Sequence, residues 1–137
     1  MATRTKDLEA LPPVVGGLTE QLDEERSHRP TQGVTPTLES VMAASGLPFG
    51  ATRQALGRTT LALYCASADS PAGLTVTVCE YPGVEQAQRG LTAATAVRGK
   101  MTGWQATAAK QSVLELLVRP DTPKEKVDAV RAAFEKL

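Results

Sequence analysis

The pattern of hydrophobic and polar positions is clearest over residues 59–81, where two runs rich in Leu, Val, Thr and Tyr flank a Ser-Pro-Ala-Gly turn at 70–73. Proline suits the second position of a type I turn, and glycine at the fourth position tolerates the left-handed conformation that follows. This combination is typical of a three-residue hairpin loop with a glycine bulge. The pattern therefore predicts two antiparallel strands that close at Ser70 and Leu74.

A helix and a second pair of strands follow this hairpin. Small and apolar residues recur at helical spacing over 84–100, which predicts a helix there. Residues 106–109 and 113–118 then form two strands on either side of a polar turn at 110–112. The segment 113–118, VLELLV, is nearly all apolar, which favours an interior strand covered on both faces.

The C-terminal segment carries the most regular helical pattern. Residues 122–125, Thr-Pro-Lys-Glu, match a capping box with proline at the first helical position. Val127, Val130, Phe134 and Leu137 then share one face at spacings of three and four. We therefore expect an amphipathic helix that packs on the sheet.

A shorter helix is expected before the hairpin. Thr35 is suited to cap it, Leu38 and Val41 share one of its faces, and Gly46 ends it. Residues 49–58 are ambiguous, because their pattern fits either a helical turn or the approach to the first strand.

Residues 1–35 are expected to form an N-terminal arm or tether, and residues 36–137 a single domain. Prolines at 12–13 and glycines at 16–17 interrupt the apolar pattern, so the arm holds only a short helix, from residue 18 to about residue 26. The arm is either a mobile lead-in or a segment that docks on this domain or on a partner.

Together these elements predict an α+β fold. It is a two-layer sandwich with a four-stranded, mainly antiparallel sheet, built as strand–strand–helix twice, with an N-terminal helical arm. A single layer of two helices would cover one face of this sheet. The first hairpin carries apolar residues on both faces, so residues 1–48, a second copy of the chain or another protein would cover the other face.

The two cysteines, Cys65 and Cys79, lie five residues from the two ends of the predicted loop. Facing residues on antiparallel strands have Cα atoms about 4.5–5.5 Å apart, a distance that a disulfide can bridge. A two-residue loop would instead give a cleaner apolar face and send the two thiols to opposite faces. Three interpretations therefore stay open: a disulfide, two buried structural thiols, or a redox or metal-binding pair.

A disulfide would place the protein in an oxidising compartment. The first ten residues carry charges where a signal peptide needs an apolar core, so the expected location is either the cytoplasm, or the periplasm or cell envelope after removal of a leader. The possible disulfide favours the second location. No run approaches the roughly 20 apolar residues of a membrane helix.

Composition excludes some classes of function. The chain is 42% hydrophobic and 22% charged with a net charge of zero, which is ordinary for a globular domain. Basic residues are too few and too dispersed for a nucleic-acid interface. His28 is the single histidine and lies in the polar arm, which argues against histidine-dependent catalysis and against zinc. We therefore expect no cofactor, no metal and no enzymatic activity.

Several other side chains could contribute to a site. Glu115 interrupts an apolar strand, so it is either exposed at an edge or partly buried beside Arg98, Lys110 or Arg119. Trp104 is either part of a small core or an exposed anchor for a partner.

The two tyrosines, Tyr64 and Tyr81, fall on opposite faces if the cysteines face each other, so they would not form one recognition surface.

The first hypothesis for function is a non-catalytic interaction or accessory-subunit module that binds another protein or a second copy of itself. The alternative is a small-ligand-binding domain with a cavity between the helix at 84–100 and the sheet. A third is a small enzyme that uses Glu80, Glu115 and Arg98 for acid–base chemistry.

Overall fold

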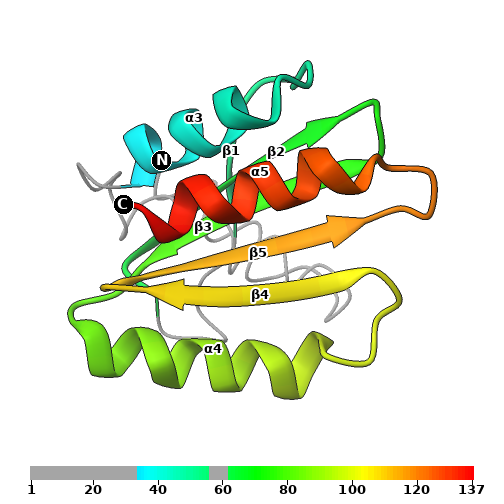
Figure 1. The fold of residues 1–137 in the computed structure, drawn as a ribbon. Coiled ribbons are helices and arrows are strands. Elements are labelled where there is room, and N and C mark those ends of the chain that lie inside the picture. The colour runs from blue at the N-terminus through cyan, green and yellow to red at the C-terminus, as the bar shows by residue number, and fades with distance from the viewer. Residues whose placement is uncertain (1–33, 56–61) are drawn as a thin grey trace, which may run out of the picture.

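A computed structural model describes residues 34–55 and 62–137 of the chain. Its elements are, in chain order, α3 (Val34–Ser45), β1 (Arg53–Ala55), β2 (Tyr64–Ser70), β3 (Leu74–Glu80), α4 (Val84–Arg98), β4 (Trp104–Ala109), β5 (Ser112–Val118) and α5 (Lys124–Glu135) (Figure 1). Most of the predicted arm, with its short helix and His28, lies outside the described residues.

The five strands form one antiparallel sheet in the order β1-β2-β3-β5-β4. This confirms the α+β class and the antiparallel sheet. It also confirms that VLELLV is an interior strand, because β5 lies between β3 and β4. The sheet has five strands instead of four, since the ambiguous segment contains the short edge strand β1, which pairs with β2. Three residues are too few to show a strand's alternating pattern.

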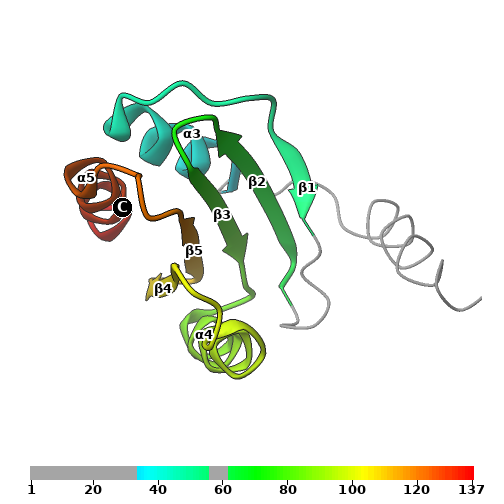
Figure 2. The same cartoon turned by 90° about the vertical axis from the view of Figure 1, so that its right-hand side faces the viewer.

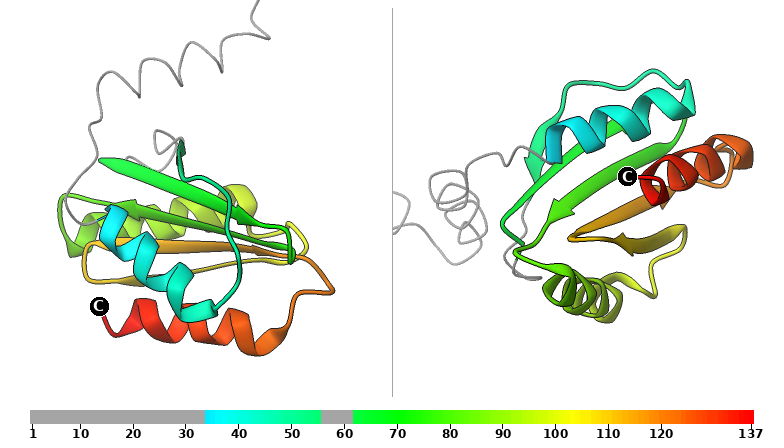
Figure 3. Two further views of the ribbon diagram at one scale, coloured as in Figure 1. Left: turned by 90° about the horizontal axis from the view of Figure 1, so that it is seen from above. Right: turned by 60° about the vertical axis from the view of Figure 1, so that its left-hand side comes forward.

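Helices cover both faces of the sheet, so the expected single layer of two helices is wrong. α3 and α5 lie side by side on one face, and α4 lies on the other (Figures 2 and 3). The cause is the strand order: β3 and β4 both flank β5 and run parallel to each other, so α4 is the crossover between them and has to pass over a face. The large apolar side chains on the opposite face are then left for α3 and α5.

We call the sheet surface that carries Val76 and Leu114 the first face. Alternate residues of the three central strands point to this face and meet apolar side chains of α3 and α5. Its fully buried members are Val34, Leu38, Val41, Leu74, Val76, Val78, Leu114, Leu116, Val130 and Phe134. This is the main hydrophobic core of the domain.

The second face is the sheet surface that carries Cys79 and Glu115. A smaller cluster lies at one end of it, under α4, and includes Cys65, Cys79, Tyr81, Ala87 and Val113. Gly90 of α4 lies so close to the ring of Tyr81 that a Cβ atom added there would overlap the ring. The small residues of α4 therefore allow close packing on the second face.

Two of the predicted helix starts are wrong. α3 already includes Thr35, so this residue lies inside the helix instead of capping it. α5 begins after Pro123, and no side chain caps it. The hydroxyl of Thr122 instead donates to the carbonyl oxygen of Gly73, with 2.8 Å between the two oxygens. Thr122 thus ties the start of α5 to the turn of the β2–β3 hairpin.

Candidate functional site

A disulfide joins Cys65 and Cys79, as one of the three interpretations predicted. The strand register pairs the two residues directly, with 4.1 Å between their Cα atoms, and both side chains are buried on the second face. The hairpin loop closes at Ser70 and Leu74, and Gly73 has a φ of 101°, the left-handed conformation that the turn chemistry predicted. The turn sequence was therefore the better guide to register than the alternation of apolar residues.

Polar side chains cross the second face in two neighbouring rows. In one row Ser67 of β2 and Thr77 of β3 share a hydrogen bond of 2.9 Å between their hydroxyl oxygens. In the next row Thr75 donates to Asp69 at 2.7 Å, and Arg53 of β1, which pairs with Ser67 in the first row, reaches across to form an ion pair with Asp69 at 2.9 Å. The hydrogen bond from Thr75, and then that from Arg53, lower the pKa of Asp69. Both threonine hydroxyls on β3 are thus occupied by partners on β2.

A buried carboxylate lies on the interior strand β5, beside these rows. Glu115 of β5 is 9% exposed, and its Oε1 atom accepts two hydrogen bonds. Nε of Arg98, from the last turn of α4, donates at 2.8 Å, and Nε1 of Trp104, the first residue of β4, donates at 3.1 Å. Of the three cations considered from sequence, Arg98 is the partner. Donors from two elements, α4 and β4, therefore converge on one carboxylate oxygen of β5.

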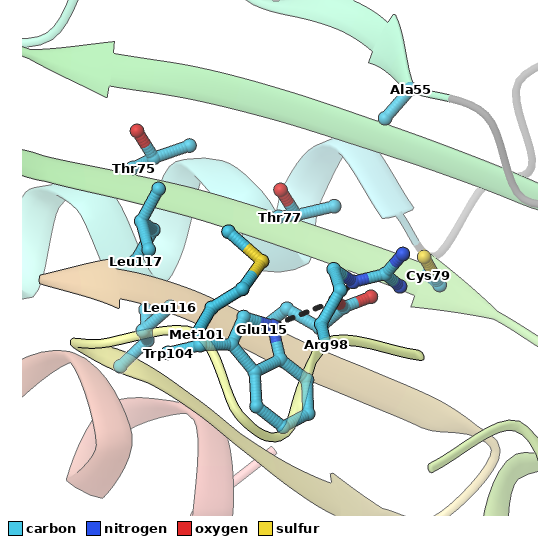
Figure 4. A pocket seen from close by; sticks show the side chains of 10 residues that line it. All are labelled: Ala55, Thr75, Thr77, Cys79, Arg98, Met101, Trp104, Glu115, Leu116 and Leu117. Atoms are coloured by element: carbon cyan, nitrogen blue, oxygen red, sulfur yellow. Dashed lines mark hydrogen bonds and ion pairs between the residues drawn. The ribbon is translucent and has the colours of Figure 1, made fainter. Parts of the chain in front are cut away.

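A hollow of about 220 Å³ lies beside this carboxylate, between the end of α4 and the second face (Figure 4). Its walls come from β1, β3, β4, β5, the last residue of α4 and the segment after that helix. The lining residues are Ala55, Thr75, Thr77, Cys79, Arg98, Met101, Trp104, Glu115, Leu116 and Leu117. Met101 is 47% exposed and Leu117 is 36% exposed, so apolar side chains of this lining reach solvent.

The structure brings together only some of the residues selected from sequence. Arg98, Trp104 and Glu115 share the hollow, and Cys79 lines it. Tyr64 belongs to the first-face core and Tyr81 to the second-face cluster, so the tyrosines lie on opposite faces as expected.

Glu80 does not form a carboxylate pair with Glu115. The residue that faces Glu115 across the ladder is Thr77, and Glu80 lies three positions further along β3, on the first face. The expected cavity is also displaced, because the middle of α4 packs closely on Tyr81 and the hollow opens only at the helix's C-terminal end.

Sequence reasoning missed Thr75, Thr77, Met101 and Leu117. The two threonines alternate with Val76 on β3, so a strict period of two would have placed them on the face opposite the main core. No sequence pattern indicates that Met101 belongs to the site, because its position beside the sheet depends on where α4 ends. Only the crossover of α4 brings it beside the sheet.

In the described ranges, no three side chains of His, Cys, Asp or Glu gather closely enough to hold a metal ion. None of the helices within those ranges is both long and apolar enough to cross a membrane. No protein-family model, curated protein or solved structure matches this chain.

Proposed function

We propose that this chain is a non-catalytic binding domain and that the hollow is its binding site. The observation that carries the proposal is the cluster of Glu115, Arg98 and Trp104 on the wall of the hollow. The Arg98 side chain is 30% exposed and that of Glu115 is 11% exposed, and an ion pair withdrawn from water in this way is seldom needed for stability, because desolvation offsets much of its attraction. A few placed polar groups in an otherwise apolar concavity are instead typical of ligand sites.

The size of the hollow limits what can bind. Drug-sized ligands usually occupy sites of about 300–1,000 Å³, and the hollow holds about 220 Å³. It therefore fits a small organic molecule or a single side chain of a larger partner. This supports the small-ligand alternative over the first hypothesis, which depended on an uncovered apolar sheet face. α4 covers part of that face, and Ser67, Asp69 and Glu115 place polar groups on the remainder.

A protein partner is a second candidate because of the exposed side chains of Met101 and Leu117. These two residues line the hollow and would contact a partner that inserts one apolar side chain. An accessory subunit of this kind would bind through the same hollow, so both candidates can be tested at one place.

The location that we propose is outside the cytoplasm, in a periplasm or cell envelope. Support comes from the disulfide between Cys65 and Cys79, since disulfides persist mainly in oxidising compartments. In this proposal the N-terminal arm acts as the tether of the domain. Fractionation of the native cells, followed by mass measurement without reductant, tests the location. Recovery from the cytoplasm with two free thiols would contradict it.

The binding proposal is tested with small neutral molecules of branched hydrocarbon character, such as 4-methylpentanamide and isobutanol. Trp104 is the single tryptophan of the chain, so its fluorescence reports on this site alone. We expect a saturable change in emission, and a rise in melting temperature of about 5–10 °C when the probe is present at 100 times its Kd.

A matched pair of variants localises the binding. Leu117→Gln places an amide in the wall of the hollow and should weaken binding at least about fivefold, because an apolar contact is replaced by a polar group that loses water on binding. Leu63→Gln changes a residue of similar exposure that does not line the hollow, and should leave the affinity unchanged. Equal loss in both variants, or no saturable change with any probe, would contradict the proposal.

A further inference from the structure

We infer that the hollow selects a small carboxylate with a branched or straight hydrocarbon body, and that the carboxylate binds the terminal nitrogens of Arg98. This inference rests on the proposed function, since it names the chemical class of ligand for the same site. It follows from three features of the hollow: the hydrogen-bonding groups that its residues leave unused, the apolar character of the remaining wall, and its volume.

Arg98 is held so that one edge of its guanidinium is used and another is open. The group has five N–H donors, and Nε donates to Glu115. In the described part of the chain the terminal nitrogens of Arg98 have no hydrogen-bond partner, and their end of the group lies toward Cys79 (Figure 4). A carboxylate matches the two terminal nitrogens of an arginine in a bidentate pair.

The balance of donors and acceptors favours an acceptor-rich ligand. Arg98 offers four further N–H groups, whereas Glu115 offers one oxygen, Oε2, that accepts no hydrogen bond from the described residues. Trp104 also donates to Glu115, which offsets part of the negative charge on Glu115 that a ligand carboxylate would face. A ligand ammonium would instead meet the donor-rich guanidinium.

The rest of the wall is apolar. Thr75 and Thr77 have their hydroxyls engaged by Asp69 and Ser67, so these threonines offer the hollow mainly hydrocarbon. Ala55, Met101 and Leu117 add apolar surface. A water molecule occupies about 30 Å³ in the liquid, so a hollow of 220 Å³ holds about seven or eight non-hydrogen atoms. A six-carbon carboxylate is of this size.

Three probes with the same carbon skeleton test the inference: 4-methylpentanoate, 4-methylpentanamide and 4-methylpentylamine, each titrated against the full chain with Trp104 fluorescence as the readout. We expect the carboxylate to bind at least about tenfold more tightly than the amide, because hydrogen bonds to a charged group are stronger. The amine should bind more weakly than the amide.

Two double variants with the same change in charge supply the control, and each replaces one arginine of α4 together with its acidic partner. Arg98→Gln with Glu115→Gln removes both charges together, so that no buried charge is left unpaired, and it should abolish the preference for carboxylate over amide. Arg89→Gln with Glu85→Gln removes an exposed ion pair of α4 and should leave that preference unchanged. The melting temperature of each variant shows whether it is folded.

The outcomes separate the inference from the proposed function. If the carboxylate and the amide bind equally at Trp104, or if the amine binds best, the inference that the ligand is a carboxylate is wrong, but the proposal that the chain is a binding domain is kept. If none of the three probes, nor isobutanol, changes the emission saturably, both fail. If the preference for carboxylate survives in the Arg98→Gln/Glu115→Gln variant, Arg98 is not the residue that recognises it.

Discussion

The two faces of the sheet differ in the side chains that they carry and in how completely helices cover them. On the first face, most alternate residues of β2, β3 and β5 are apolar, and two helices bury them. On the second face, a disulfide and the small residues of α4 close one end, and the other end keeps a hollow beside the partly buried ion pair of Arg98 and Glu115. The comparison shows that apolar packing on one face of a sheet can stabilise the domain while the other face keeps polar side chains that are not needed for the core.

The largest effect that distinguishes the faces is expected from Phe134→Ala in α5. Phe134 is fully buried in the first-face core, so truncation should lower the free energy of unfolding by about 3–5 kcal/mol. Urea unfolding measures this loss. Because Phe134 lies away from the hollow, the affinity for the carboxylate probe should be unchanged at temperatures where the variant is folded. A changed affinity would mean that the two faces are not independent.

The disulfide between Cys65 and Cys79 lies in the cluster that closes one end of the second face. The double variant Cys65→Ala with Cys79→Ala opens a loop of sequence separation 14 and should cost about 3 kcal/mol in the chain-entropy model. Urea unfolding of this variant, beside the oxidised wild type, measures the difference. A loss below about 1 kcal/mol would show that the β2–β3 hairpin persists in the unfolded chain and already restricts it.

How well the sequence predicts each face depends on whether its contacts join residues that are close together in the chain or far apart. The first face is set by local patterns: alternation in β3, the apolar run of β5 and helical spacing in α5 place Val76, Leu114 and Phe134 in the core. The disulfide register also follows from a local feature, the turn at 70–73. These parts could be predicted because each depends on residues close together in the chain.

The hollow could be predicted only in part, because it depends on which elements become neighbours. Glu115 stands out in the sequence, and Arg98 was one of three candidate partners. That Arg98 is the partner follows from the crossover of α4 over β5, which no local pattern encodes. The capping box at 122–125 failed for a related reason, since the hairpin turn competes for the Thr122 hydroxyl.

A smaller effect is expected where α4 contacts the second face. Gly90→Ala improves helix propensity by about 0.5–1 kcal/mol, but its Cβ would overlap the ring of Tyr81. Overpacking of this kind costs about 1–3 kcal/mol, so the net result should be destabilisation of about 1 kcal/mol in urea. Adding Tyr81→Ala removes the overlap, and the cost of Gly90→Ala should then disappear. If Gly90→Ala is stabilising by itself, α4 is not packed as tightly as described.

The smallest effect concerns the charged end of the second face, where Thr75 and Arg53 hold the pKa of Asp69 below its ordinary value of 3.8. A carboxyl whose pKa is lower in the folded state stabilises the fold above its unfolded pKa and loses that contribution as the pH falls through the folded value. Asp69 and Arg53 are both more than half exposed, so solvent screening limits the contribution to about 0.2–1 kcal/mol.

Thr75→Val isolates this contribution, because it removes the hydrogen bond that lowers the pKa of Asp69 most. Its stability difference from wild type, measured by urea unfolding, should contain a part that is constant from pH 7 to about pH 5 and shrinks below about pH 4. The same substitution in an Asp69→Asn background should lack that pH-dependent part. A pH-dependent part that persists without the Asp69 carboxyl would assign the effect to another group. Because the Thr75 methyl also belongs to the wall of the hollow, unchanged probe affinity in Thr75→Val would show that the hydroxyl serves the sheet and not the ligand.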